Sequence, residues 1–138
     1  MVNCWIALDD TQLAGALELV RYSHQWSPSK PDSNFHGPRH YRKAMEQAAR
    51  NENRTPDIFH VKVPAGGASF HHGWVWHGSG KNNTDTSRRA LVLHGISSAA
   101  EFVPNRLHEG NGPIYSRYRL TNSTYLDTKY FPILWTQT

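Results

Sequence analysis

Residues 70–94 constrain the fold of this chain more than any other segment. An aromatic run ends at His77, a stretch rich in Gly, Ser and Asn follows, and Arg88 then opens an apolar strand. Gly and Asn supply the turn chemistry that lets two antiparallel strands fold back on each other. The segment therefore predicts a β-hairpin that brings His77 and Arg88 close together.

The two ends of this predicted hairpin differ in chemistry. A neutral imidazole such as that of His77 is the commonest protein ligand for a transition metal, and the Arg88 guanidinium can hold a carboxylate through two parallel hydrogen bonds. Alternate residues of the following strand share the face of Arg88, namely Ala90, Val92 and His94. A charge on an inward face needs a partner, which is either a bound anion or a protein carboxylate. Arg89 is the less suitable clamp, because it shares the opposite face with leucines.

Blocks of sequence spread along the chain resemble one known family. In chain order they are residues 4–11, 15–20, 23–24, 63–67, 77–94 and 131–135. Within the fifth block, His77-Gly78-Ser79-Gly80 is followed by Asn82 and then by Arg88-Arg89-Ala90. Together these blocks resemble the phytanoyl-CoA dioxygenase family of Fe(II)/2-oxoglutarate-dependent enzymes.

The resemblance implies a fold, two cofactors and a set of site residues. The fold would be mainly β, a double-stranded β-helix of the jelly-roll, cupin-like type. His77 would be the distal ligand of Fe(II), and Arg88 with Ser79 would hold the far carboxylate of 2-oxoglutarate. Trp5 would lie against the cosubstrate, although a plain core role for Trp5 is equally open. The reaction would hydroxylate a small organic substrate with release of succinate and CO2.

One part of the family pattern is missing. The family completes its two-histidine, one-carboxylate iron site with a His-x-Asp pair, but no histidine here has an acidic residue two positions later. In the family that pair precedes the strand that begins this chain. We therefore expect residues 1–138 to form a single partial jelly-roll domain, incomplete on its N-terminal side and without turnover by itself. The alternatives are a non-catalytic binding or interaction module, or a truncated gene product, that retains the anion pocket at Arg88.

Other histidines and carboxylates are weaker candidates for the site. His71 and His72 are neighbours on a predicted strand, so at most one of them can share a side with His77. His24 is expected to be structural. Asp9 and Asp10 end the first predicted strand, residues 2–8, and are expected to accept backbone hydrogen bonds in a turn rather than to bind a metal.

Residues 27–56 form a long polar excursion between predicted strands. Residues 39–50 within it are mostly good helix formers, which predicts a short helix. An excursion of this length is too long for a simple connection and is expected to be a lid-like insertion that selects the substrate. Further strands are predicted at 15–20, 60–63, 68–72, 74–77 and 114–120.

Composition narrows the range of partners. The net charge of +4 comes from basic residues that are scattered along the chain, which argues against a nucleic-acid partner and is compatible with an anionic small molecule. One cysteine, Cys4, cannot form an internal disulfide and is typical of a cytoplasmic protein. No apolar run is long enough to cross a membrane. Strand edges left unpaired by an incomplete barrel are expected to favour self-association.

Overall fold

A computed structural model describes residues 1–11, 15–27, 40–102 and 118–136 of the chain. By compactness the chain divides into two units. The first contains the described residues up to 95, and the second contains those from 96 onward. The expectation of one domain over residues 1–138 stays a prediction.

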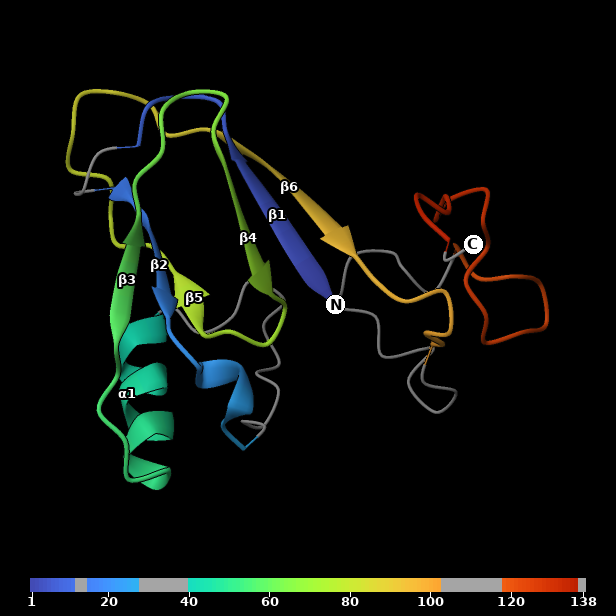
Figure 1. The fold of residues 1–138 in the computed structure, drawn as a ribbon, viewed down its shortest axis with the longest axis horizontal. Helices are drawn as coiled ribbons and strands as arrows, with labels where there is room; N and C mark the ends of the chain where they lie inside the picture. The colour runs from blue at the N-terminus through green and yellow to red at the C-terminus, as the bar shows by residue number, and fades with distance from the viewer. Residues whose placement is uncertain (12–14, 28–39, 103–117, 137–138) are drawn as a thin grey trace. The chain divides into compact units, whose positions relative to one another are not determined.

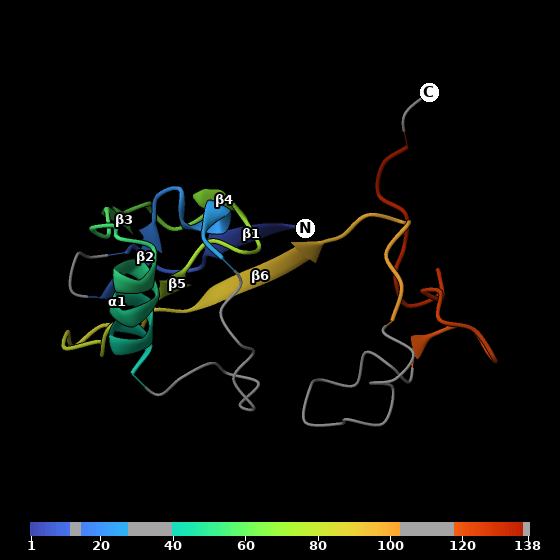
Figure 2. The same ribbon diagram turned by 90° about the horizontal axis from the view of Figure 1, so that it is seen from below.

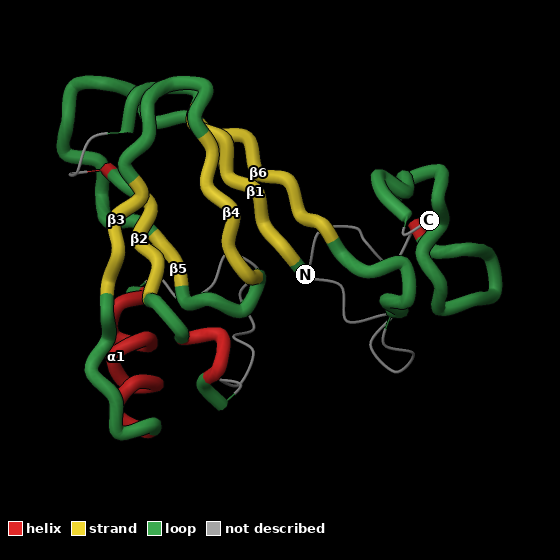
Figure 3. Tube along the Cα trace, in the orientation of Figure 1, coloured by secondary structure: helices red, strands yellow, loops and turns green. Residues whose placement is uncertain are grey.

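The first unit is mainly β and contains two three-stranded antiparallel sheets (Figure 1). The first sheet has the order β4-β1-β6, with β4 at Ala68–His72, β1 at Val2–Ala7 and β6 at Ala90–Gly95. The second has the order β3-β2-β5, with β3 at Ile58–Val61, β2 at Leu17–Val20 and β5 at His77–Gly78. Figure 3 shows the two groups of strands as separate sets within the unit.

The predicted hairpin between His77 and Arg88 is wrong. β5 pairs with β2 in one sheet, whereas β6 pairs with β1 in the other, so the segment between them crosses from sheet to sheet. Turn-forming residues predict where a chain bends but not which strand the next segment will pair with. In the predicted strand over residues 74–77, only His77 has strand pairing, because the chain turns between β4 and β5.

The inner face of β1 carries the core between the two sheets. Asn3, Trp5 and Ala7 alternate with less buried residues along the strand, as expected when one face of a strand is buried. Trp5 is 5% exposed and packs in one cluster with Ala7, Leu17 and Val61. Trp5 therefore lies in the core that joins the sheets.

Helix α1, Tyr41–Asn51, confirms the helix predicted within residues 39–50. It lies beside β2 and β5 (Figure 2). Met45 and Ala49 of the helix pack against Val20 and Trp26. The Glu18 side chain on the same side of β2 is buried and accepts hydrogen bonds from Tyr41 and Arg42. The lid-like role of residues 27–56 stays a prediction, since residues 28–39 lie outside the described part.

The second unit has little regular structure among its described residues. Isolated bridges join Glu101 to Tyr125 and Arg119 to Leu126. The Tyr118 and Tyr130 rings lie 4.5 Å apart. Most of the strand predicted at 114–120 falls outside the described residues. No described helix has the length and apolarity that crossing a bilayer requires.

Candidate functional site

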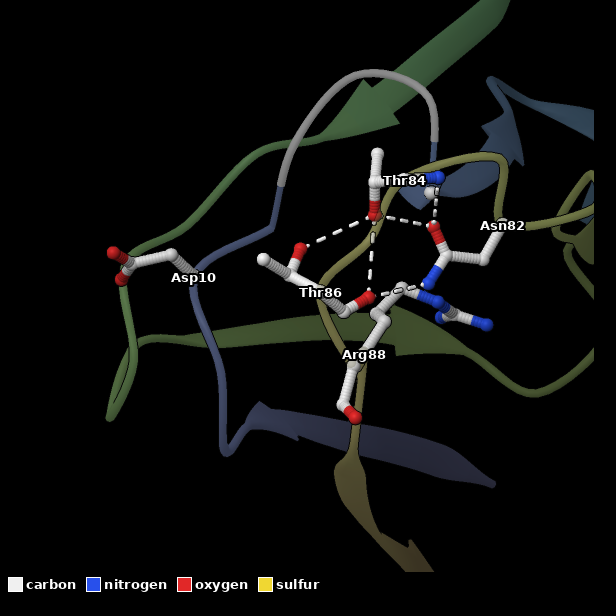
Figure 4. Close-up of a pocket in the computed structure, with 7 residues that line it drawn as sticks. Asp10, Asn82, Thr84, Thr86 and Arg88 are labelled. Carbon is white, nitrogen blue, oxygen red and sulfur yellow. Dashed lines mark hydrogen bonds between the residues drawn. The ribbon is translucent and has the colours of Figure 1, made fainter.

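Arg88 and Ser79 meet across the loop that follows β5. Arg88 Nη2 donates a hydrogen bond of 3.0 Å to Ser79 Oγ, and the arginine is half-buried. Arg88 lines a small open pocket together with Asp10, Gly15, Asn82, Thr84, Thr86 and Ser87 (Figure 4). A Cβ on Gly15 would lie 3.3 Å from Arg88 Cδ, so the glycine lets the arginine stem pass closely.

Asn82 fixes the shape of the loop that leads to Arg88. Its Oδ1 accepts hydrogen bonds from the backbone N–H and the hydroxyl of Thr84, and its Nδ2 donates to the carbonyl of Thr86 (Figure 4). A short polar side chain that bonds its own backbone nearby is the usual way in which Asn stabilises a turn. These local hydrogen bonds shape the loop from Asn82 to Thr86. Leu8, which directly follows the first strand, holds the end of the loop next to Arg88, because its backbone N–H donates to the Arg89 carbonyl.

Among the described residues, Arg88 forms no ion pair with a carboxylate. Asp10 lines the same pocket, but its carboxylate and the Arg88 guanidinium point in different directions (Figure 4). Asp10 instead accepts a hydrogen bond from the backbone N–H of Ala65 at 2.7 Å. A guanidinium has five N–H donors, so Arg88 keeps donors for a bound anion.

Arg89 is committed to a surface ion pair. Its side chain donates to both carboxylate oxygens of Asp9, at 3.0 and 2.7 Å, and its backbone N–H also donates to Asp9. The hydrogen bonds from Arg89 lower the pKa of Asp9 to about 2. Asp9 and Asp10 thus accept backbone hydrogen bonds, as predicted, but the donors are the distant residues Arg89 and Ala65 rather than residues of a local turn.

His77 lies on the inner side of the second sheet, where it remains exposed to solvent. It pairs with Leu19, and its ring centroid lies 5.1 Å from that of His71. His77 Nδ1 donates to the carbonyl of Val75 at 2.7 Å. Because a neutral imidazole carries one proton, Nε2 keeps its lone pair, which is the form that binds metals.

Only one of the two adjacent histidines is near His77. His71 contacts it, whereas the His72 ring lies 5.2 Å from the His24 ring. The expectation that at most one of the pair would share a side with His77 is confirmed, because neighbouring side chains on a strand point to opposite faces.

A row of polar side chains crosses the first sheet, and sequence reasoning missed it. Asn3 stands opposite both His71 and His94 in the strand register. Asn3 Oδ1 lies 2.8 Å from His94 Nδ1, and Asn3 Nδ2 lies 3.4 Å from His71 Nε2. The alternation of β1 already placed Asn3 on the face of Trp5, and a buried amide requires hydrogen-bond partners. The need of a buried amide for partners is therefore the feature of the sequence from which this row could have been predicted.

His71 is the most perturbed group of the row. Burial, followed by the neighbouring imidazoles of His77 and His94, lowers the pKa of His71 to about 4. Its Nδ1 is buried without a hydrogen-bond partner. The side chain is therefore neutral at pH 7 and presents an unused nitrogen inside the fold.

The described residues do not build a three-ligand iron site. No group of three or more His, Cys, Asp or Glu side chains in this part of the chain is arranged to hold a metal ion. His77 and Arg88 lie on different sheets, and their link is Ser79, which follows His77 by two positions and receives the hydrogen bond from Arg88. The assignments of His77 to iron and of Arg88, Ser79 and Trp5 to 2-oxoglutarate stay predictions.

Comparison with known proteins agrees with the resemblance seen in the sequence. The family model described as phytanoyl-CoA dioxygenase (PhyH) matches residues 1–90, which include both His77 and Arg88. No curated protein matches the chain.

Similar solved structures include two non-haem α-ketoglutarate-dependent enzymes of nogalamycin biosynthesis. For the carbocyclase SnoK the TM-score is 0.52 at 24% identity, over 66% of this chain and 35% of that chain. For the epimerase SnoN the TM-score is 0.41 at 24% identity, over 66% of this chain and 30% of that chain. The chain thus matches about a third of the length of each structure, and the likeness to SnoK supports a shared fold.

Proposed function

Because the chain belongs to the phytanoyl-CoA dioxygenase family, we propose that Arg88 and Ser79 bind the far carboxylate of 2-oxoglutarate. His77 is proposed to supply one imidazole to Fe(II), in an oxygenase that hydroxylates a small organic substrate and releases succinate and CO2. The 138-residue chain by itself is proposed to bind the cosubstrate without turnover, because the described residues offer no complete ligand set for the metal.

The fold proposed for this site is an incomplete jelly roll. An eight-stranded jelly roll consists of two four-stranded sheets built from Greek keys. The observed sheets have three strands each, in the orders β4-β1-β6 and β3-β2-β5. They match the jelly-roll pattern if one further strand lies beside β6 and another beside β5. Among the described strands, β5 and β6 each have one edge without a partner, and copies of this chain are proposed to associate there.

The observation that carries the proposal is the free donor capacity of a half-buried Arg88. Its single described side-chain partner is the Ser79 hydroxyl. A hydroxyl that accepts a hydrogen bond from Arg88 can also donate one to the carboxylate that Arg88 binds. A planar guanidinium recognises a carboxylate through two parallel hydrogen bonds, with geometry as well as charge. The pair is therefore suited to a carboxylate rather than to a spherical anion.

Trp5 is proposed to act as a wall of this site rather than as a hydrogen-bonding group. It is buried with Ala7, Leu17 and Val61 between the sheets. A large apolar ring there is proposed to limit the access of water from the inner side of the fold, and a lower local dielectric strengthens the interaction of a guanidinium with a carboxylate.

A titration of the metal-free chain with 2-oxoglutarate tests the proposal. Arg88→Gln should weaken binding by at least ~10-fold, since a hydrogen bond to a charged group contributes about 1.5–3 kcal/mol. Arg89→Gln is the matched control, because this adjacent arginine is paired with Asp9, and should change the affinity less than about 3-fold. Pyruvate, which lacks the far carboxylate, should bind equally weakly to the wild-type chain and to Arg88→Gln. Equal losses in the two arginine variants would contradict the assignment.

A second assay addresses turnover. With Fe(II), ascorbate and candidate substrates, the isolated chain should form no succinate above background. Sustained consumption of 2-oxoglutarate would show that the chain binds iron with ligands outside its described residues.

The second candidate function is a non-catalytic carboxylate-binding module. It is favoured by the contrast between a built anion pocket at Arg88 and the lack of a three-ligand metal set among described residues. Addition of Fe(II) separates the two candidates. Tighter 2-oxoglutarate binding with Fe(II) supports the oxygenase, whereas unchanged binding supports the module.

A further inference from the structure

Two imidazoles from different sheets are neighbours on the inner side of the fold. The His71 and His77 rings belong to β4 and β5, and their centroids lie 5.1 Å apart. We propose that this pair binds a divalent transition metal ion such as Co²⁺, Ni²⁺ or Zn²⁺, with water completing the coordination shell. The site uses described residues alone, so it requires neither 2-oxoglutarate nor a carboxylate ligand.

The spacing of the rings fits a shared ion. A metal–nitrogen distance of about 2.1 Å and a roughly tetrahedral angle place the centroids of two imidazole ligands about 5 Å apart. The observed planes are inclined at 54°, so the rings are not stacked face to face.

His77 has the tautomer that metal binding requires. Its Nδ1–H donates to the Val75 carbonyl at 2.7 Å, so the lone pair lies on Nε2. Histidine ligands in proteins commonly donate their other N–H to a backbone carbonyl or a carboxylate, which fixes the orientation of the ring. His77 is therefore oriented as a ligand before any metal arrives.

His71 contributes the second, independent sign of a missing partner. It is 9% exposed, and its Nδ1 is buried without a hydrogen-bond partner. Buried polar atoms in folded proteins nearly always have a partner. A metal ion bound to Nδ1 would satisfy this atom, provided that the ring proton is on Nε2.

Asn3 can hold that proton in place. Its amide lies between His71 Nε2 and His94 Nδ1 and presents a donor on one side and an acceptor on the other. A half turn of the amide lets Asn3 accept from His71 Nε2–H and donate to His94 Nδ1. The same residue thus supports His71 as a free side chain and as a ligand.

The choice of metal follows from the ligand types. Imidazole nitrogen favours Zn²⁺, Ni²⁺, Co²⁺ and Cu²⁺ over Mg²⁺ and Ca²⁺, which prefer oxygen. Two protein ligands and several waters bind more weakly than the closed four-ligand sites of structural zinc. The occupant is therefore an exchangeable ion.

A second histidine pair provides an internal comparison. The His24 and His72 rings lie 5.2 Å apart, which is nearly the same spacing, and His24 Nδ1 is also buried without a hydrogen-bond partner. His72 Nδ1, however, accepts a hydrogen bond from the Trp74 backbone N–H, so the proton of its neutral ring is on Nε2. The spacing of the rings alone would predict a metal site at each pair. The protonation of His72 on Nε2 and the hydrogen bond to its Nδ1 leave no free lone pair on that ring, so a metal site is predicted only at His71 and His77.

Titration of the full chain with Co²⁺, followed by visible absorption and calorimetry, tests the proposal. His71→Gln and His77→Gln should each weaken Co²⁺ binding by ~10-fold or more, and the double variant should lose little beyond either single variant, because ligands of one ion act as a unit. His72→Gln, at the adjacent position, should bind like the wild type. Absence of Co²⁺ binding by the wild-type chain, or equal losses in His71→Gln and His72→Gln, would overturn the proposal.

Imidazole ¹⁵N spectra of the wild-type chain avoid any dependence on how the variants fold. Zn²⁺ should shift His77 Nε2 and His71 Nδ1 and leave His72 and His24 in place; shifts confined to other histidines would contradict the site. Arg88→Gln should keep the Co²⁺ affinity. The metal pair therefore does not depend on carboxylate binding at Arg88. It does share His77 with the proposed Fe(II) ligand, so His71→Gln separates the two proposals: this variant should weaken Co²⁺ binding and leave the affinity of the metal-free chain for 2-oxoglutarate unchanged.

Discussion

The two proposed sites, a carboxylate end at Arg88 and a histidine end at His71, differ in how many segments of the chain build them. Ser79, Asn82 and Arg88, which form the carboxylate end, all belong to the single connection between β5 and β6. The histidine end consists of Asn3, His71, His77 and His94, which come from four strands. The carboxylate end therefore depends mainly on local hydrogen bonds, with Asp10 and Gly15 as distant residues that complete its lining. The histidine end depends on the packing of both sheets.

This difference predicts which end should fail first when the fold is perturbed. Variants that separate the sheets should affect the histidine end at once. Asn3, His71 and His94 meet through strand register in the first sheet, but His77 reaches His71 from the other sheet. The carboxylate end should persist while its loop remains closed. The largest losses are expected from variants that affect both ends.

Trp5→Ala should have the largest effect. Removing a buried aromatic side chain costs about 3–5 kcal/mol, and Trp5 is central to the cluster between the sheets. Urea denaturation measures the loss. Trp5→Phe is the control and should cost much less, because most of the buried volume remains. If Trp5→Phe instead lowers the affinity for 2-oxoglutarate with stability unchanged, Trp5 contacts the cosubstrate directly.

Gly78→Ala should have the next largest effect, because Gly78 lies between His77 and Ser79. A Cβ there would lie 2.7 Å from the Tyr41 ring of α1, and overpacking of this kind costs about 1–3 kcal/mol. The displaced strand should weaken both Co²⁺ and 2-oxoglutarate binding. Gly80→Ala is the matched control, because nothing lies within 4 Å of its added Cβ. Equal behaviour of the two variants would show that β5 can shift freely.

Asn3→Ala should affect only the histidine end. It removes the one amide between His71 and His94, and leaving buried polar atoms unpaired costs about 1–3 kcal/mol. Thermal unfolding measures the loss of stability, and Co²⁺ titration should show weaker binding. The affinity for 2-oxoglutarate, measured under conditions where the variant is folded, should stay that of the wild type. A parallel loss of both ligands would mean that the two ends are coupled.

Asn82→Ala is the reverse experiment and should affect only the carboxylate end. The loop bonds to Thr84 and Thr86 are exposed, so the free energy of unfolding should change by less than ~1 kcal/mol. Loss of these bonds should lower the affinity for 2-oxoglutarate by roughly 3–10-fold, because one ordinary hydrogen bond contributes about 1 kcal/mol. Asn83→Ala is the neighbouring control. A fall in Co²⁺ affinity would contradict the separation of the ends.

The same division explains what the sequence could predict. The alternation of β1, the helix over Tyr41–Asn51 and the link between Ser79 and Arg88 depend on nearby residues or on a motif with fixed spacing. The predicted hairpin failed because the pairing of β6 with β1 is decided by the packing of the whole sheet. The hydrogen bond between Asn3 and His94 joins residues 91 positions apart, and no local pattern reports a contact of that range.

The two adjacent arginines give the smallest and most specific prediction. Hydrogen bonds from Arg89 lower the pKa of Asp9 to about 2 in the folded chain, whereas the ordinary value near 3.8 applies when the chain is unfolded. A carboxyl whose folded pKa is depressed stabilises the fold above the unfolded value, and this contribution is lost as the pH falls from about 4 to about 2. Asp9→Asn should therefore flatten the fall of stability across this window, as followed by urea denaturation at each pH. Because the ion pair is exposed, stability at pH 7 should change little, and the affinity for 2-oxoglutarate should not change at all. A loss of 2-oxoglutarate binding in Asp9→Asn would mean that Arg89, once released from Asp9, competes with Arg88 for the carboxylate or displaces it from the pocket.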